Sequence, residues 1–225
     1  MGRHLLYINN RIDDEYQPEH HLRPYFTLPY TMVTPPLGEQ VPSSDGFSHI
    51  VISGGKPSVL DQNDWQKAEM DLIRCAVSKN KNLLGICFGH QLIAATLFGL
   101  HSVCRRKDPE LGWTEMRVLK DDKLCGKRGQ IYHGYVSHND DVIKVCEDTA
   151  DIIMDSQDCA IHGFKLKDKN IWGLQAHFEI SIAEGLRFTE LELHKNPEIA
   201  PLVLNLRHPK DSGFIDSLME RFQML

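Results

Sequence analysis

The feature that most constrains the fold of this chain is the heptad 85–91 (GICFGHQ), which places a cysteine between two glycines. An apolar run over 83–86 leads into the cysteine, and a helix-forming run over 92–98 follows it. This order predicts a strand, a sharp turn and a helix, because small flanking residues permit a tight backbone turn. A side chain on such a turn stands at the end of a strand in an α/β sheet, where a substrate can reach it.

Cys87 is the candidate nucleophile on this turn. It precedes the expected helix, whose unpaired N–H groups carry partial positive charge. That field lowers the pKa of a thiol and increases the fraction of reactive thiolate. The other cysteines occur singly, with no Cys-x-x-Cys pair, and are expected to be reduced, buried and inert. They are Cys75, Cys104, Cys125, Cys146 and Cys159.

The segments before the turn predict an α/β fold. Residues 5–8 are apolar and residues 49–53 are apolar and β-branched, which predicts two strands. Residues 64–77 repeat apolar side chains at helical spacing after a capped start at Asp61 and Asp64. The alternation of strand, helix, strand and helix is typical of a mostly parallel central sheet flanked by helices.

Beyond His101 the pattern changes to shorter extended pieces, so we expect the sheet to gain antiparallel strands there. These pieces cover 113–119, 129–136, 151–154, 159–166 and 170–177. From Ile180 the chain turns helical, and prolines divide the remainder into shorter helices that end with one over 214–222. We interpret these helices as a helical C-terminal layer.

The proline-rich region over 24–42 predicts a peripheral loop between the first two strands rather than a linker. Charged and histidine side chains shortly before it are expected on a solvated loop face. They are Asp13, Asp14, Glu15, His20 and His21.

Composition limits the classes of function. With 225 residues, 41% hydrophobic and 25% charged, the chain suits a single domain over 1–225. A net charge of -6 gives no electrostatic footprint for nucleic acid or an anionic membrane. Residues 82–104 carry no charge, but glycines and histidines interrupt them, which favours a buried strand and helix over a membrane span. No signal peptide is indicated, so we expect a cytoplasmic protein with a small polar substrate.

A thiolate nucleophile needs a base, and His177 is the best placed of the twelve histidines. It ends an apolar run, and Glu179 lies two residues further on, so in extended chain both side chains point to the same face. Glu179 can then accept from one imidazole nitrogen and leave the other nitrogen toward Cys87. These residues predict a Cys-His-Glu triad.

Acyl transfer also needs hydrogen-bond donors for the developing oxyanion. On a turn of this kind, one donor is the backbone N–H after the nucleophile, which belongs to Phe88. The second is expected from the Gly54-Gly55 pair, because glycine lets the backbone approach a reacting carbonyl.

Four blocks, 53–55, 85–91, 137–138 and 173–179, resemble in order and spacing the class I glutamine amidotransferase family. They are most similar to the amidotransferase part of GMP synthases and to stand-alone relatives that include γ-glutamyl peptide hydrolases. The resemblance covers about residues 45–180 and leaves 181–225 as a helical C-terminal extension. It implies a flavodoxin-like fold with a mostly parallel sheet and added antiparallel strands.

The resemblance further implies hydrolysis of the glutamine side-chain amide through a γ-glutamyl thioester on Cys87. His177 is then the base and acid, and Glu179 orients it. Gly55 and Phe88 form the oxyanion hole in this interpretation.

Substrate contacts follow from the same resemblance: Gln91 holds the bound glutamine, and Ser137 and His138 meet its α-carboxylate and amino group. The released ammonia is expected to pass to a separate synthetase partner, because the chain leaves no room for a synthetase domain. No Gly-x-x-x-x-Gly-Lys loop is present, so neither ATP nor another cofactor is expected.

Three residues depart from the family pattern. The family usually has an aromatic residue before the catalytic histidine and a proline before the glutamate, where this chain has Ala176 and Phe178. After the Gly-Gly pair the family expects a proline directly, whereas Lys56 comes first here. We interpret these departures as a change in substrate rather than lost chemistry.

Two alternatives stay open beside a partner-dependent glutaminase. The same triad can cleave a γ-glutamyl bond in a peptide or conjugate without a partner. The chain can also be a catalytically silent binding or regulatory module, although the intact triad residues speak against it.

The remaining histidines do not predict a metal site. His133, His138 and His162 have no carboxylate or cysteine companions at ligand spacing in the sequence. His90, which follows the turn, is expected to be a packed helix histidine rather than a base.

Overall fold

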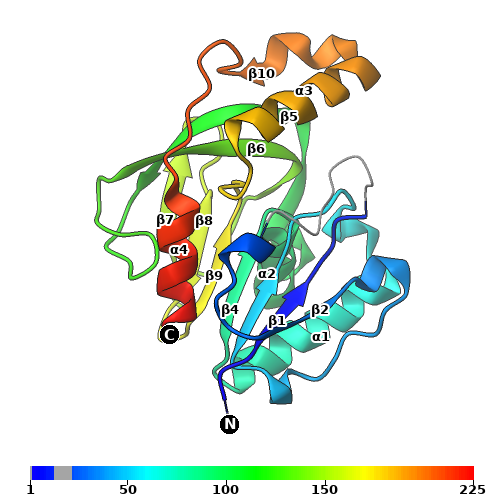
Figure 1. The fold of residues 1–225 in the computed structure, drawn as a ribbon, viewed down its shortest axis with the longest axis vertical. Coiled ribbons are helices and arrows are strands. Elements are labelled where there is room, and N and C mark those ends of the chain that lie inside the picture. Colours follow the sequence, from blue (N-terminus) through cyan, green and yellow to red (C-terminus); the bar gives the residue numbers. More distant parts are fainter. Residues whose placement is uncertain (1, 13–21) are drawn as a thin grey trace.

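The computed structural model describes residues 2–12 and 22–225, and within them ten strands form one mixed sheet (Figure 1). The sheet order is β10-β5-β7-β8-β9-β4-β3-β1-β2, and β6 pairs with β5 beside this path. The strands are β1 Leu5–Ile8, β2 Tyr30–Val33, β3 His49–Ile52, β4 Asn82–Ile86, β5 Val103–Val118, β6 Ile131–Val142, β7 Ala150–Ser156, β8 Gly163–Leu166, β9 Ile171–Leu174 and β10 Val203–Leu204.

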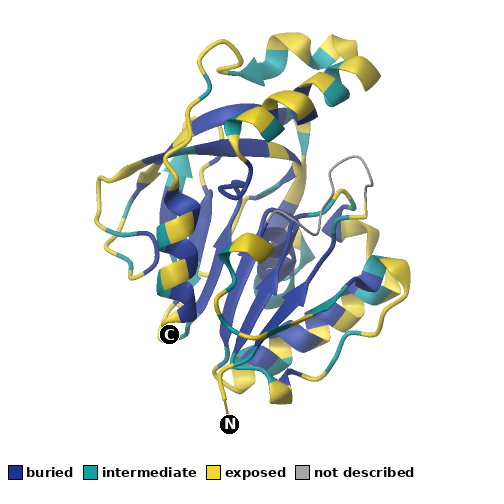
Figure 2. Cartoon of the chain, viewed as in Figure 1, coloured by how far each residue is buried: buried dark blue, intermediate teal, exposed yellow. Residues whose placement is uncertain are grey.

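Five neighbouring strands, from β9 to β2, run parallel and position the expected turn. β1, β3, β4 and β9 are buried along their whole length, as Figure 2 shows for the centre of the sheet. Parallel strands that are covered on both faces read as continuous apolar runs, which is the pattern of these segments. The mostly parallel α/β class that the sequence predicts is therefore confirmed.

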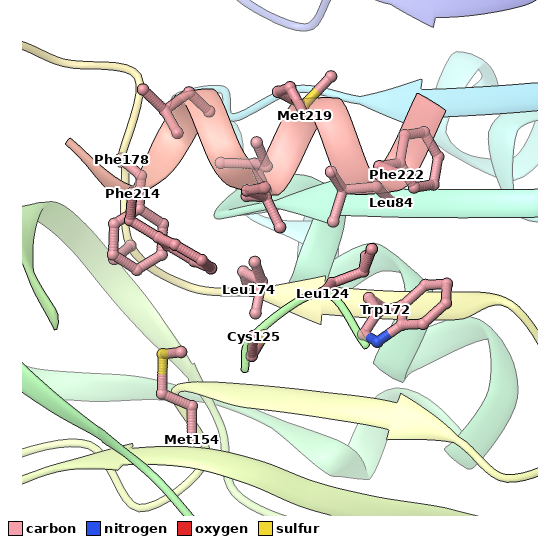
Figure 3. Close-up of a cluster of buried hydrophobic side chains, with 14 of the residues drawn as sticks. Leu84, Leu124, Cys125, Met154, Trp172, Leu174, Phe178, Phe214, Met219 and Phe222 are labelled. Carbon is pink, nitrogen blue, oxygen red and sulfur yellow. The ribbon is translucent and has the colours of Figure 1, made fainter. Parts of the chain in front are cut away.

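Helices cover both faces of this parallel half. α1 (Asp64–Ser78) and α2 (Phe88–Phe98) pack on one face against a cluster that includes Leu6 and Ile50. α4 (Phe214–Gln223) packs on the other face against Leu84 and Leu174, as the close-up in Figure 3 shows. Alternate residues of each strand thus face different helices, as the two-residue period of a strand requires.

The other half of the sheet is built from longer antiparallel strands. β5 pairs with β6 on one side and β7 on the other, and β8 pairs antiparallel with both β7 and β9. α3 (Ile182–Lys195) lies over this half, where Phe188 packs with Trp113 and Tyr135. The expected gain of antiparallel strands beyond His101 is confirmed.

Several local expectations are corrected by the structure. The proline-rich region contains an edge strand, β2, whose pairing with β1 over four residues was not visible in the sequence. The first extended piece beyond His101 is longer than predicted, because β5 begins at Val103. α3 and α4 pack on different parts of the sheet and do not form a single C-terminal layer (Figure 1).

The start of α1 also differs from the prediction. Its N-cap is Asn63, whose backbone N–H donates to Oε1 of Gln66 at 2.8 Å. Asp61 instead caps the preceding 3-10 turn, where it accepts from the backbone of Ser58 at 3.1 Å. Both pairs are capping boxes, so two adjacent helix starts were merged into one in the sequence interpretation.

The cysteines are less uniformly buried than expected. Cys125 and Cys159 are buried, whereas Cys104 and Cys146 are exposed and Cys75 is half-buried. The sequence expectation of burial is therefore wrong for the last three. Asp13, Asp14, Glu15, His20 and His21 lie outside the described residues. Among the described helices, none combines the length and hydropathy that a membrane span would need.

Candidate active site

The turn at Cys87 has the strained backbone that its sequence predicts. Cys87 joins β4 to α2 with φ 51° and ψ -105°, a region that a residue with a side chain rarely adopts. A methyl group at Gly85 would lie 2.4 Å from the carbonyl oxygen of Gly89, and one at Gly89 would lie 2.3 Å from that of Ile52. Both glycines are required because α2 begins in direct contact with β4 and β3.

Cys87 and His177 face each other across Gly54. A Cβ atom at Gly54 would lie 3.3 Å from Cβ of Cys87, 3.3 Å from Nε2 of His177 and 2.5 Å from Cε1 of its ring. The thiol and the imidazole are therefore near neighbours, and each shifts the pKa of the other. The two groups, ninety positions apart in the chain, therefore meet as the sequence predicts.

Glu179 lies on the far side of the imidazole. Its Oε1 is 2.7 Å from Nδ1 of His177, which leaves Nε2 toward the thiol. The sequence predicts this contact because residues two positions apart in extended chain point to the same face. That reason is wrong here, because β9 ends at Leu174 and residues 177–180 form a turn. The backbone N–H of His177 donates to the carbonyl of Tyr135 at 2.8 Å, which fixes the turn against β6.

Arg11 completes this cluster, and the sequence interpretation missed it. Its guanidinium nitrogen lies 2.9 Å from Oε1 of Glu179 and 2.8 Å from Nδ1 of His177. One ring nitrogen cannot donate to Glu179 and accept from Arg11 at the same time. The raised pKa of His177 favours Nδ1–H as donor to Glu179, with Arg11 bonded to Glu179. The available signal was the position of Arg11 just after β1, at the edge of the sheet where Cys87 also lies.

The charges of the cluster favour a thiolate and an imidazolium. Burial would raise the pKa of Cys87, but the adjacent His177, with smaller contributions from His138 and Arg11, lowers it. Burial would lower the pKa of His177, but Glu179 and the Cys87 thiolate raise it to about 9. Burial would raise the pKa of Glu179, but His177 and Arg11 lower it to about 2. Both pKa shifts favour the thiolate and imidazolium over the neutral thiol and imidazole.

A cavity of about 270 Å³ opens above Cys87. Six of the eight predicted site residues line it: Gly55, Cys87, Gln91, Ser137, His138 and His177. Phe88 and Glu179 lie behind this lining, with the Phe88 ring packed against Trp65 and the Glu179 side chain only 1% exposed.

The backbone N–H of Phe88 is the first in α2 and has no partner within the helix, as an oxyanion donor requires. Cys87 itself is 4% exposed, so it is reached through the cavity and not from the outer surface.

Gln91 projects from the first turn of α2 into the same cavity. Its amide nitrogen donates to the carbonyl of Asp140 at 2.8 Å and to Oε1 of Gln175 at 3.1 Å. Both amide hydrogens are thus used within the protein, so Gln91 can only accept a hydrogen bond from a ligand, through its own Oε1.

His138 is held at the cavity wall by carboxylates from β5 and β6. Its Nε2 lies 3.0 Å from Glu110, and its Nδ1 lies 3.3 Å from Asp141. Burial would lower the pKa of His138, but these two carboxylates raise it to about 9. A cationic imidazole therefore forms part of the cavity wall, with both ring nitrogens directed at these carboxylates. Glu110 had no sequence signal, because it is a single charged residue within a long strand.

The family departures have different structural consequences. Ala176 and Phe178 are buried and do not line the cavity. The Phe178 ring packs at 4.8 Å, edge to face, against Phe214 of α4, so it anchors the His177 turn to the core (Figure 3). Of the three departures, Lys56 alone lines the cavity.

His90 packs inside the protein as expected, with its ring 5.1 Å from that of Phe164. His133 lies apart, 3.5 Å from Glu115. The reason for expecting no metal is contradicted, however, because the fold brings Glu110, Cys159 and His162 within ligand distance of one another.

Comparison with known proteins identifies the family of this site. The model of the family "Glutamine amidotransferase class-I" matches residues 26–194. The glutamine-hydrolyzing GMP synthase subunit of Methanocaldococcus jannaschii is 34% identical over 151 residues, covering 67% of this chain and 74% of that protein. The protein of the same name from Methanothermobacter thermautotrophicus is 31% identical over 193 residues, covering 83% and 94%. A glutamine amidotransferase structure from Thermotoga maritima superposes with a TM-score of 0.74 at 22% identity, covering 100% and 97%, which supports the fold.

Proposed function

This chain belongs to the class I glutamine amidotransferase family, and we propose that it hydrolyses the side-chain amide of glutamine through a γ-glutamyl thioester on Cys87. The observation that carries this proposal is the placement of His177 between the thiol and Glu179. The thiol-facing nitrogen is Nε2, and Nδ1 lies 2.7 Å from the carboxylate. This arrangement matches the geometric roles of a nucleophile, a base and a carboxylate that orients the base.

In the first half-reaction, the Cys87 thiolate attacks the amide carbon of glutamine. The carbonyl oxygen becomes an oxyanion, for which the N–H groups of Phe88 and Gly55 are the proposed donors. The C–N bond then breaks, and Nε2–H of His177 gives its proton to the leaving nitrogen, which departs as ammonia.

In the second half-reaction, water attacks the thioester carbon and His177 takes up one of its protons. The C–S bond breaks, glutamate leaves, and the thiolate and imidazolium are restored. Glu179 stabilises the imidazolium at each stage and is not itself protonated. Each cycle converts glutamine and water into glutamate and ammonia.

The rest of the cavity is suited to the amino-acid end of glutamine. Ser137 and His138 are the proposed contacts for the α-carboxylate, with His138 acting through its positive charge because both of its ring nitrogens already face Glu110 and Asp141. Gln91, restricted to accepting a hydrogen bond, suits the α-ammonium group. We assign residues 1–225 to one amidotransferase unit, since β1 and α4 pack into the same core as β4.

A separate synthetase protein is the proposed acceptor of ammonia. The two archaeal relatives are named as one subunit of a glutamine-hydrolyzing GMP synthase, which makes a partner chain the simplest analogy for this protein. A cytoplasmic location and the absence of a bound cofactor remain our expectations.

The test is to incubate purified protein with glutamine and measure ammonia and glutamate. We expect equal amounts of both, and a covalent adduct at Cys87 with a glutamine-like electrophile. Cys87→Ala should abolish both results while the protein stays folded, whereas Cys146→Ser, at an exposed position, should change neither. Undiminished turnover in Cys87→Ala would refute the assignment, and failure to form the adduct would favour a silent module.

A γ-glutamyl peptide or conjugate is the second candidate substrate. Lys56 and Arg105 line the cavity beside the proposed glutamine contacts, and they suit a carboxylate beyond the scissile bond. Parallel assays with glutamine and glutathione decide between the candidates. If glutathione is cleaved and glutamine is not, a γ-glutamyl peptide replaces glutamine as the proposed substrate. In that case Lys56→Gln should raise KM for glutathione several-fold.

A further inference from the structure

We propose that Glu110, Cys159 and His162 form a binding site for one transition-metal ion of the zinc class. The site lies directly behind His138, which forms part of the cavity wall. It is separate from the triad, and it does not depend on the proposed hydrolysis.

The three residues come together only in the folded chain. Glu110 lies in β5, and Cys159 and His162 lie in the connection between β7 and β8. One ligand atom from each residue lies within 4.8 Å of the other two. The exposed fractions are 2% for Glu110, 2% for Cys159 and 1% for His162. A thiol, an imidazole and a carboxylate thus converge in a region closed to bulk water.

His162 provides an independent sign of a missing ligand. Within the described part of the chain, neither Nδ1 nor Nε2 of this buried ring has a hydrogen-bond partner. Buried polar atoms in folded proteins are nearly always satisfied, so an exception indicates an ion or a water molecule. Oε1 of Glu110 lies 4.0 Å from Nε2, a distance too long for a hydrogen bond but suited to two ligands of one ion.

Among the residues that the structure describes, neither carboxylate oxygen of Glu110 has a hydrogen-bond partner. Its Oε2 has two cationic neighbours, Nε2 of His138 at 3.0 Å and the Arg106 guanidinium at 3.6 Å. Arg106 is held more closely by Asp141, at 2.5 Å, and so keeps a partner when Glu110 binds a cation. Oε1 of Glu110, which lies toward His162, is the oxygen that would bind the ion.

The loop that carries Cys159 is already fixed by hydrogen bonds. The backbone N–H of Cys159 donates to Oγ of Ser156 at 3.1 Å, and its carbonyl accepts from the N–H of Ser156 at 2.9 Å. The thiol is therefore positioned by a closed turn and needs little rearrangement to reach an ion.

The donor set selects the class of metal. Sulfur, nitrogen and oxygen ligands in one site favour zinc and similar ions over magnesium or calcium, which prefer oxygen alone. Binding releases the thiol proton to solvent and forms a metal–sulfur bond. The negative charges of the thiolate and of Glu110 then lie beside the divalent ion, while Asp141 remains the carboxylate partner of Arg106 and His138. Water can occupy the fourth coordination position.

Cobalt titration provides the test, because a thiolate bound to Co²⁺ gives a sulfur-to-metal charge-transfer band. The titration uses chelator-treated full-length protein carrying Cys87→Ser, which removes the active-site thiol. We expect one equivalent of Co²⁺ with this band, displaced by Zn²⁺ and not by Mg²⁺. Adding Cys159→Ser should abolish the band, and adding His162→Gln should weaken binding at least about tenfold, whereas Cys146→Ser should leave both unchanged.

A buried water molecule is the competing explanation for the unsatisfied imidazole, and it predicts no band at all. A missing band in the Cys87→Ser protein, or a band that persists after Cys159→Ser, would overturn the proposal. If Cys159→Ser does not fold by circular dichroism, thermal unfolding of the Cys87→Ser protein decides. One equivalent of Zn²⁺ should then raise its Tm, and an unchanged Tm would count against the site.

Discussion

Only a hydrogen atom fits between the backbone of Gly54 and the ring of His177, because a Cβ at position 54 would lie 2.5 Å from Cε1 of the imidazole. Gly54 therefore sets how closely the base approaches the nucleophile. We predict that Gly54→Ala displaces the imidazole and lowers kcat by about 100-fold or more, because displacement of a catalytic group by about 1 Å has an effect of this order.

The matched control is Gly46→Ala, where an added methyl group meets no atom within 4 Å. Steady-state kinetics and thermal unfolding of both variants check the prediction. We expect both proteins to fold and only Gly54→Ala to lose activity. Equal activity in the two variants would mean that the imidazole approaches the substrate from another direction.

Glu179 and His177 differ in role, and their variants should differ in effect. Glu179 orients the imidazole and holds its pKa high, whereas His177 moves the proton. Glu179→Gln should therefore lower kcat less than His177→Ala does. Kinetics of the two variants under identical conditions check this order, and equal losses would contradict the assigned roles.

Arg11 is predicted to set the acidic limit of activity. Its positive charge lowers the pKa of both Cys87 and Glu179. Arg11→Gln removes this effect, so both pKa values rise and less of the reactive ion pair exists at low pH. We expect the acidic limb of the pH profile of kcat/KM to move upward by up to about 1 pH unit.

The control for this variant is Arg11→Lys, which retains the charge. It should keep the acidic limb close to its original position even if KM changes, because Arg11 also lines the cavity. A loss of activity by the same factor at every pH in Arg11→Gln would indicate a purely structural contribution.

The reactive turn was predictable because its information is local. The Gly-x-Cys-x-Gly spacing between an apolar run and a helix leaves few alternatives, and the structure places Cys87 on such a turn. His177 and Glu179 were found for a partly wrong reason, since they meet across a turn and not along a strand. Their separation of two residues still brought them together, because Tyr135 fixes the backbone of that turn.

Contacts between distant segments were not predictable in the same way. Arg11 reaches Glu179 across 168 positions, and Glu110 reaches His162 only because β5 lies beside the connection before β8 in the folded sheet. The edge strand β2 was missed because its alternation is weak and prolines surround it. Such features depend on the sheet order, which the spacing of strands along the chain does not determine.

The last prediction concerns Glu69, a carboxyl group of α1 that is 0% exposed and accepts a 3.0 Å hydrogen bond from Asn10 at the edge of the site. Burial, opposed in part by this bond, raises the pKa of Glu69 to about 8 from 4.5. The unfolded chain loses this proton near pH 4.5 and the folded protein only near pH 8, so stability falls as pH rises between them.

Glu69→Gln keeps a neutral side chain of similar shape. We expect its free energy of unfolding to exceed that of the original protein by on the order of a few kcal/mol at about pH 8, with no difference near pH 4. Urea unfolding at a series of pH values measures this gain, with the exposed Asp64→Asn as control. His177, whose pKa is also raised, contributes to the loss of stability above pH 6.5 in every variant, so the difference between the two curves isolates Glu69. Parallel curves for Glu69→Gln and the original protein would mean that Glu69 is ionised when folded and that the loop carrying Asn10 is held in another way.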